Sequence, residues 1–238
     1  MPINPHAPKT LTFISQVEQT FACLMRFADP GEDNLGGKLL YAGELNEAGC
    51  ILAIAGNISG AATLAASAQT AALRQAMHTG VIDFLVNSLD EALRILKNEV
   101  RKREPVSVAV SIAHQEIAQE MLVRGVLPDL LPPHLPSAPG DSSFDTFIAL
   151  GAQRIAPSPL PRASKLLIWQ IPAEFARRPL DFDALLLQHL PLSDRAAARW
   201  LRQSPRYLGP QFRRLRSLRC DEETTSKLIK VLGSPLQN

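Results

Sequence analysis

The sequence predicts a doubly wound α/β fold, in which helices cover both faces of a parallel sheet. Short apolar runs alternate with amphipathic helical segments between residues 38 and 131, and the step from one run to the next is nearly constant. The runs are apolar almost throughout, as expected for strands that are buried on both faces. An N-terminal helix and a mainly helical, basic C-terminal lobe are predicted to flank this unit.

Five apolar runs supply the predicted strands. In chain order they are KLLYAG (38–43), AATLAAS (61–67), VIDFLV (81–86), VSVAVSI (106–112) and VLPDLL (126–131). Segments with helical patterns separate these runs, so we expect the strands to lie parallel in one sheet.

The helices between the strands carry recognisable end signals. Ser88, followed three residues later by Glu91, forms a capping box, and the helix after it repeats apolar residues every three or four positions. Thr70 is expected to cap the helix over residues 70–79. Gly80 and Gly125 are expected to end the helices before them with positive φ.

Two further segments flank the predicted sheet. Residues 11–27 are predicted to form an amphipathic helix that docks on the domain or on a second copy, because they lack the basic face of a membrane-surface helix. After Leu131 the chain becomes rich in proline, and the apolar runs 146–151 and 165–171 are each expected to add a strand to the sheet. The later segments, 181–190, 192–203 and 212–220, are expected to be helical. We therefore divide the chain into 1–35, 36–140 and 141–238.

Composition limits the class of protein. The formal net charge of +2 on 238 residues favours no particular partner. The cysteines are odd in number and far apart, which fits a reducing cytoplasm better than a disulfide framework; they are Cys23, Cys50 and Cys220. No stretch approaches about 18 uninterrupted apolar residues, so no membrane partner is expected. We expect a soluble cytoplasmic protein.

No motif identifies a catalytic residue or a metal site. The five histidines show neither H-E-x-x-H nor Cys/His spacing, and a nucleophile elbow and a P-loop are missing. His114 and His134 follow the fourth and fifth predicted strands, at the edge where ligands bind, although a loop histidine can also be merely solvated. Asp83 and Asp129 are expected to bond nearby backbone or a helix cap rather than act as acid or base. Cys50 is expected to be a packed thiol rather than an activated one.

The turn after the first predicted strand is the diagnostic position for a dinucleotide. It reads YAGELNEAGC, where Gly43 and Gly49 are separated by the acidic residues Glu44 and Glu47. A dinucleotide turn needs glycines close to the pyrophosphate and few negative charges. The second strand ends in Ser67, where an acidic residue would accept hydrogen bonds from a ribose.

From about Gly37 to Gly125 the chain resembles the Rossmann-type domain of urocanase (urocanate hydratase). The resemblance rests on GKLLYAGELNEAG, GNISGAA, AALRQAMHTGVID, SLDEALRILKNEVRKREPVSVAV and MLVRGVLPDLL. It implies an NAD-binding Rossmann-like fold, with the NAD turn at positions 44–52 and an Asp-Gln-Thr-Ser segment where this chain has PPHLPS (132–137). The positions that match the family's cofactor site are Gly43, Glu47, Ala48, Gly49, Ser67 and His114.

The resemblance implies a truncated urocanase domain with a degenerate NAD site and no bound cofactor. The function we expect is a non-catalytic binding or interaction module, with a second copy or another protein as partner. The alternative is urocanate hydratase, a hydro-lyase of histidine catabolism that uses NAD to add water to urocanate, with a partner chain completing the site. We lean against an enzyme.

A third interpretation rests on the C-terminal arginines. Eight arginines lie between Arg195 and Arg219, interleaved with Trp200, Tyr207 and Phe212. Such a cluster can bind phosphates and stack on bases. Arginine stems also cover apolar surface on ordinary helices, and no nucleic-acid-binding signature accompanies the cluster. We therefore expect no nucleic-acid binding.

Overall fold

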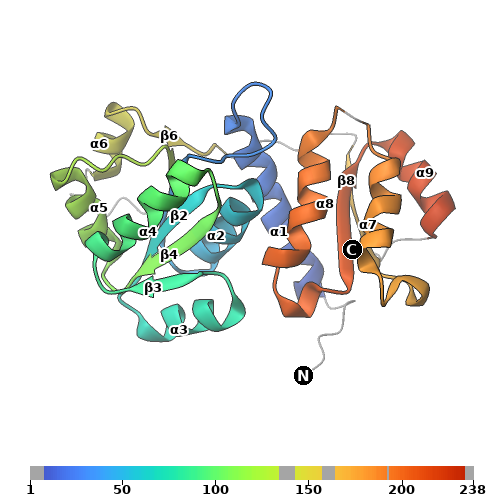
Figure 1. The fold of residues 1–238 in the computed structure, drawn as a ribbon, viewed down its shortest axis with the longest axis horizontal. Helices are drawn as coiled ribbons and strands as arrows, with labels where there is room; N and C mark the ends of the chain where they lie inside the picture. Colours follow the sequence, from blue (N-terminus) through green and yellow to red (C-terminus); the bar gives the residue numbers. More distant parts are fainter. Residues whose placement is uncertain (1–7, 134–142, 157–163, 192, 234–238) are drawn as a thin grey trace.

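The computed structural model describes residues 8–133, 143–156, 164–191 and 193–233. Among these residues, six strands form one parallel sheet in the order β3-β4-β2-β1-β5-β6, and two more strands form a separate antiparallel sheet. Figure 1 shows the parallel sheet and its helices on one side, the second sheet and its helices on the other, and α1 between them. The predicted doubly wound α/β fold is confirmed.

Each predicted apolar run in the range 38–131 contains one strand of the parallel sheet. These strands are β1 (Leu39–Glu44), β2 (Ala62–Ala66), β3 (Phe84–Val86), β4 (Val106–Val110) and β5 (Leu130–Leu131). Only the last two residues of the last run are strand, and just before them the Asp129 carboxylate accepts a hydrogen bond from Leu39 N at 2.7 Å. Asp83 likewise accepts from Ser107 N at 2.8 Å. Both aspartates bond backbone, as predicted.

Helices cover both faces of the sheet. On one face lie α2 (Glu47–Ser59) and α3 (Thr70–Thr79), and on the other lie α4 (Leu89–Lys102), α5 (His114–Val123) and α6 (Ser143–Ala149). Successive strand residues point into opposite cores, since Leu40 of β1 packs with the first group and Tyr41 with the second. This two-sided burial explains why the strands read as continuous apolar runs.

The helix ends agree in part with the predicted signals. Ser88 caps α4 by accepting from Glu91 N at 3.3 Å, but the Glu91 side chain bonds Asn87 N instead of returning to Ser88. The prediction that Thr70 caps α3 is wrong: the helix begins at Thr70, and the residue before it donates its backbone N–H to the hydroxyl of Ser67. The turn after β2 is therefore built on Ser67. The glycines behave as predicted, with φ of +75° at Gly80 and +66° at Gly125.

The predicted N-terminal helix is α1 (Pro8–Leu24), which continues into the short 3-10 turn η1 (Met25–Phe27). It packs against α2 on one side and α8 (Arg195–Tyr207) on the other, and its apolar stripe is buried. The docking interpretation is confirmed for contacts within one chain. None of the helices in the described parts of the chain has both the length and the apolar character that a membrane span needs.

The C-terminal lobe differs most from the sequence prediction. Residues 165–171 do form a strand, β7 (Lys165–Gln170), but it pairs antiparallel with β8 (Leu215–Cys220) and not with the parallel sheet. Segment 212–220, predicted to be helical, is the short 3-10 turn η3 (Pro210–Phe212) followed by β8. Two further helices pack on this pair, α7 (Pro179–Gln188) and α9 (Glu222–Leu232). The short 3-10 turn η2 (Ala173–Phe175) follows β7.

The prediction of a strand at 146–151 is also wrong. Most of this run lies in α6, and the next strand is β6 (Gln153–Arg154), which pairs parallel with β5. The parallel sheet thus includes a strand from beyond residue 140. The domain limits 36–140 and 141–238 remain a prediction.

The strand order fixes where a ligand can bind. The chain leaves β1 through α2 toward β2 on one side, and later returns through α5 to β5 on the other side of β1. The sheet therefore has its topological switch point between β1 and β5. In open α/β sheets, ligands bind beyond the carboxyl ends of the strands at this point.

Candidate functional site

A cavity of about 280 Å³ lies at the switch point. We call it the switch-point cavity. Its walls come from the carboxyl end of β1, the first turns of α2, the first residue of α5, the residues just after β5, and one face of α1. Five segments that are distant in sequence therefore meet around one space.

Three side chains from neighbouring strand ends meet beside this cavity, and two of them, Glu44 and His114, line it. Glu44 ends β1, Ser67 follows β2 and His114 opens α5 after β4. Ser67 Oγ donates to Glu44 Oε1 at 2.5 Å, and His114 Nδ1 lies 3.0 Å from Glu44 Oε2. The Glu44 carboxylate is thus held on both oxygens. We call the carboxylate and the imidazole the Glu44–His114 pair.

The pairing determines the imidazole tautomer. An ionised carboxylate only accepts hydrogen bonds, so Nδ1 of His114 carries the proton and donates it to Glu44. The hydroxyl of Tyr41 donates to the carbonyl oxygen of His114 at 2.5 Å and fixes the backbone there. His114 is 7 % exposed, and its Nε2 has no hydrogen-bond partner among the residues that the structure describes.

Two glycines shape the turn that leads from β1 into α2. Gly43 has a φ of +72° at an irregularity in the pairing of β1 with β2. Gly49 lies so close to β1 that a Cβ there would be 2.1 Å from the carbonyl oxygen of Glu44. Asn46 caps α2 by accepting from Gly49 N at 3.0 Å. The glycines therefore let the start of α2 approach the end of β1.

The structure brings the positions matched to the family's cofactor site to one end of the sheet. Ser67 and His114 meet through Glu44, and the remaining four positions lie along the turn and the first residues of α2: Gly43, Glu47, Ala48 and Gly49. Glu44 is the central residue, yet the sequence marked it only as an obstacle to a phosphate. Its position as the last residue of β1 was the available signal.

The other candidate residues have no convergent arrangement. Cys50 is half-buried in the first turn of α2, and its pKa is raised, first by burial and then by the charge of Glu47. It is a packed thiol, as predicted. His134 lies outside the described residues. Within those residues, no group of three histidine, cysteine or acidic side chains has the arrangement of a metal site.

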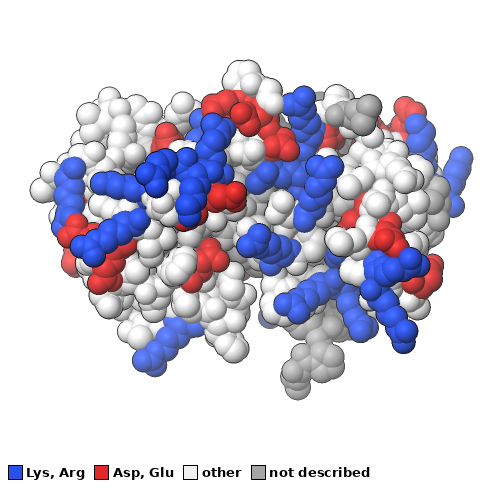
Figure 2. Space-filling view, viewed as in Figure 1, with Lys and Arg blue, Asp and Glu red and all other residues white. Residues whose placement is uncertain are grey.

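The C-terminal arginines divide into two groups. Four bond within the chain: Arg195 to the carbonyl of Gly31, Arg199 to that of Ile58, Arg216 to Asp183 and Arg219 to Glu18. The other four are exposed, namely Arg202, Arg206, Arg213 and Arg214. The interleaved aromatic rings, Trp200, Tyr207 and Phe212, are all buried. Figure 2 shows basic side chains spread over both halves of one face with acidic ones among them. The burial of the three rings indicates that they pack inside the protein and do not stack on nucleic-acid bases.

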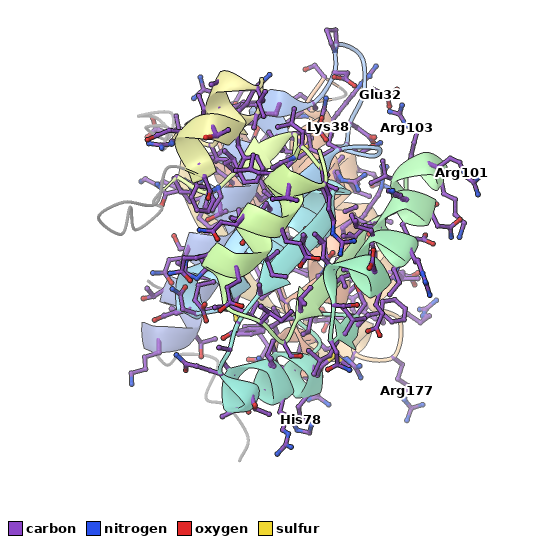
Figure 3. All side chains as sticks on the ribbon, turned by 90° about the vertical axis from the view of Figure 1, so that its left-hand side faces the viewer. Glu32, Lys38, His78, Arg101, Arg103 and Arg177 are labelled. Atoms are coloured by element: carbon purple, nitrogen blue, oxygen red, sulfur yellow. The ribbon has the colours of Figure 1, made fainter. Side chains whose placement is uncertain are left out.

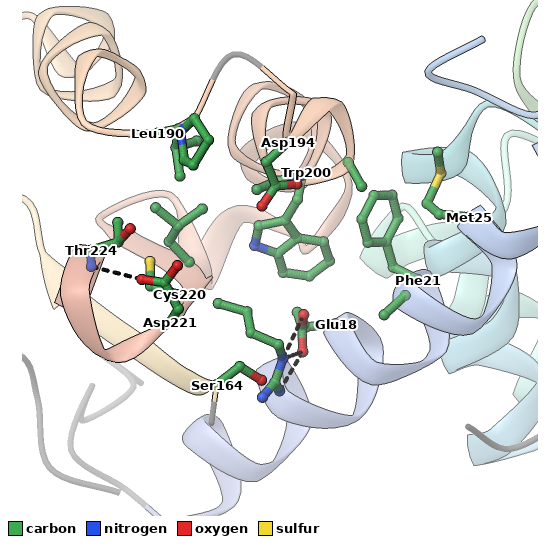
Figure 4. Close-up of a pocket in the computed structure, with 16 residues that line it drawn as sticks. Glu18, Phe21, Met25, Ser164, Leu190, Asp194, Trp200, Cys220, Asp221 and Thr224 are labelled. Carbon is green, nitrogen blue, oxygen red and sulfur yellow. Dashed lines mark hydrogen bonds and ion pairs between the residues drawn. The ribbon is translucent and has the colours of Figure 1, made fainter. Parts of the chain in front are cut away.

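A second cavity, of about 340 Å³, lies between α1 and the C-terminal lobe (Figure 4). We call it the seam cavity. Glu18 of α1 and Arg219 of β8 form a two-pronged ion pair in its wall, with nitrogen–oxygen distances between 2.6 and 3.0 Å. Asp221 caps α9 by accepting from Thr224 N at 2.7 Å. Burial, followed by the charges of Asp221 and Asp194, raises the pKa of Cys220 to about 12. The Glu18–Arg219 pair joins α1 to the C-terminal lobe.

A parallel, doubly wound sheet with a cavity at its switch point defines a Rossmann-like α/β binding domain. The sequence model of one family, the urocanase Rossmann-like domain, matches residues 15–135. The match covers just over half of the chain, so the chain belongs to the urocanase Rossmann-like domain family. The matched range starts inside α1 and ends just after β5, and it contains every residue that lines the switch-point cavity.

Proposed function

We propose that this chain is a urocanase-type domain that has lost NAD binding and serves as a non-catalytic binding or interaction module. The observation that carries the proposal is the Glu44 carboxylate, held by Ser67 and His114 at the strand ends where the family's NAD turn falls. A dinucleotide would have to bring its negative charges to this carboxylate.

The electrostatic cost of that approach is large. A carboxylate about 4 Å from a phosphate charge costs about 4 kcal/mol at an effective dielectric constant of about 20. One backbone hydrogen bond to the phosphate returns less than this. Glu47, in the first turn of α2, adds a second negative charge where a pyrophosphate would use the helix N-terminus.

The ribose contact and the available space also argue against a dinucleotide. Ser67 stands where an acidic residue would accept the ribose hydroxyls, and its own hydroxyl is already engaged with Glu44. The cavity of about 280 Å³ lies at the lower limit of about 300–1,000 Å³ for drug-sized ligands, and a dinucleotide is larger than these. The residues present do not fit NAD.

Without NAD the chain has no reagent for urocanate hydration, because the resemblance gives the cofactor the role of electrophile. To test the proposal, the protein is purified, denatured and analysed for released NAD by mass spectrometry. The native protein is also supplied with NAD and urocanate, and the loss of urocanate is followed by absorbance. We expect less than stoichiometric NAD and no hydration. One NAD per chain, or hydration above the rate without protein, would refute the proposal.

A further inference from the structure

The Glu44 carboxylate has no lysine or arginine partner in the part of the chain that the structure describes. It accepts hydrogen bonds from the Ser67 hydroxyl and from His114 Nδ1, and no lysine or arginine lies within ion-pair distance of it. Its side chain is only 25 % exposed. Charged groups that are largely removed from water are usually paired with an opposite charge. Glu44 is an exception to this rule unless His114 is positively charged.

The His114 imidazole does not supply that charge. A second proton would sit on Nε2, which is buried and has no hydrogen-bond partner among the described residues. Burying the N–H of a cation without an acceptor costs more than burying the unprotonated nitrogen of a neutral ring. The imidazole is therefore neutral, and the Glu44–His114 pair has a net negative charge. Because Nε2 is covered, a ligand in the cavity meets the carboxylate and not this atom.

Nothing else in the described wall of the cavity offsets the charge. Its lining residues include no lysine and no arginine. The N-terminus of α2 carries a partial positive charge, but Glu47 in the first turn of that helix already offsets it. A carboxylate can accept about four hydrogen bonds, and the donors found for Glu44 are the Ser67 hydroxyl and His114 Nδ1. Glu44 therefore has both charge and acceptor capacity left for a cationic donor that enters the cavity.

The rest of the wall limits the size and character of that cation. Most of the lining is apolar, including Leu52 of α2 and the prolines after β5, Pro132 and Pro133, while Gln16 and Gln19 of α1 bring neutral amides to exposed positions on the rim. A metal ion would need several oxygen ligands, whereas apolar walls with a few polar groups suit a small organic molecule. The ligand therefore combines a cationic N–H donor with an apolar body.

We propose that the switch-point cavity binds a small primary amine, whose ammonium group donates to the Glu44 carboxylate and whose alkyl or aryl body packs on the apolar wall. This inference rests on the proposed function, because the carboxylate that repels the phosphates of NAD is the one that attracts the ammonium group. A lysine side chain of another protein carries the same ammonium chemistry, so the test includes both sources.

The test is isothermal titration calorimetry on the full chain at a pH of about 7, where amines are cations. The probes are benzylamine, 2-phenylethylamine, cyclohexylamine and n-hexylamine. The comparison compounds are the alcohols with the same bodies, phenylacetate, methylammonium, Nα-acetyl-lysine amide and NAD. We expect at least one amine to bind with a dissociation constant of about 1 mM or tighter. Replacing its ammonium group by a hydroxyl or a carboxylate should weaken binding by about tenfold or more.

One substitution removes the charge and keeps the shape. In Glu44→Gln, the amide oxygen still accepts from His114 Nδ1 and the amide nitrogen can donate to Ser67 Oγ. Amine binding should weaken by about tenfold or more with the thermal midpoint retained. The matched control is Glu32→Gln, which breaks an exposed pair with Arg103 near the amino ends of the strands. Figure 3 shows Glu32 beside Arg103 at the surface. This control should leave binding unchanged.

A second substitution tests the site without changing Glu44. Ala48 is an exposed residue at the start of α2 and lines the cavity. Ala48→Lys supplies an ammonium group from the chain itself, which should compete with the added amine and weaken its binding by about tenfold. Ala48→Met introduces a side chain of similar length without the charge, so it should weaken binding less than Ala48→Lys does.

Each outcome supports or overturns one statement. No binding by any of the amines, alcohols that bind as tightly as their amines, or equal binding by Glu44→Gln would overturn this inference and leave the loss of NAD intact. Methylammonium that binds as tightly as the best amine would overturn the role of the apolar wall. Nα-acetyl-lysine amide that binds more tightly than every free amine would replace the small molecule by a protein side chain. NAD that binds more tightly than every amine would overturn the proposed function as well.

Discussion

The switch-point cavity and the seam cavity have similar volumes, and α1 forms part of the wall of both. They differ in what their charged groups already bind. In the seam cavity, Glu18 pairs with Arg219 across the two lobes, and both side chains are almost buried. In the switch-point cavity, Glu44 pairs with His114 inside one domain, and the Nε2 atom of His114 has no partner in the part of the chain that the structure describes.

This difference indicates which of the two cavities is the better candidate for a binding site. The larger cavity is lined by an ion pair that joins α1 to β8 and by the aspartate that caps α9, so those groups have a structural use. The smaller cavity sits at the switch point and is lined by His114, whose buried Nε2 has no hydrogen-bond partner among the described residues. A buried polar atom without a hydrogen-bond partner is therefore a better guide to a binding site than the volume of the cavity.

The largest expected effect is on the seam. Glu18→Ala leaves Arg219 buried without its partner, and the loss of a buried ion-pair partner costs about 3–5 kcal/mol of unfolding free energy. Urea denaturation followed by circular dichroism measures it. The matched control is Glu223→Ala, which breaks an exposed pair with Lys227 and should leave the urea midpoint unchanged. Equal effects of the two variants would show that the seam pair is not structural.

A smaller effect concerns the thiol beside the seam cavity. The pKa of Cys220 is raised from 9.0 to about 12, so the unfolded chain loses this proton at lower pH than the folded chain. The unfolding free energy should therefore fall as pH rises from about 9 toward about 12, and Cys220→Ala should make the fall shallower. Cys50→Ala, a change of the same thiol type near the switch-point cavity, should flatten it less. Urea midpoints measured between pH of about 8 and about 11 test this difference; identical slopes for both variants would contradict it.

The smallest expected effect is on the exposed arginines. The variant Arg202→Ala/Arg213→Ala/Arg214→Ala changes exposed side chains that form no ion pair within the described residues, so stability should stay the same. Arg216 is left unchanged, because it is buried against Asp183. Fluorescence anisotropy with a short single-stranded RNA and DNA should detect no binding by either protein near physiological salt. Micromolar binding by the natural chain that the variant loses would establish a nucleic-acid interface.

Local sequence patterns were sufficient for the parallel sheet and insufficient for the second one. The runs from Leu39 to Leu131 are apolar because helices bury both faces, and that signal is readable without knowing the partners. β8 contains Arg216 and Arg219, which read as part of a solvated helix. Their carboxylate partners, Asp183 and Glu18, lie 33 and 201 positions away, and no local pattern reveals them.

The same limit applies to the candidate site. The sequence indicated the right end of the sheet, because strand ends and the β1–α2 turn are recognisable from their residues. It did not indicate that Glu44 would turn toward Ser67 and His114, which are 23 and 70 positions further along the chain. The pair depends on the strand order, in which β2 lies between β1 and β4.

The ion pair between Glu18 and Arg219 also has a consequence for how the chain folds during synthesis. Glu18 leaves the ribosome before its partner, which follows 201 positions later. The α/β domain can complete its sheet long before β8 exists, because N-terminal domains fold first as the chain grows. Until α8 has been made, one face of α1 stays exposed to solvent. Phe21 on this face then lacks its contact with Trp200, whose ring centre lies 5.3 Å from that of Phe21 in the folded protein. Such long-range contacts form late and slowly, so α1 is enclosed on this face only after α8 has been made, although α2 can cover its other face much earlier.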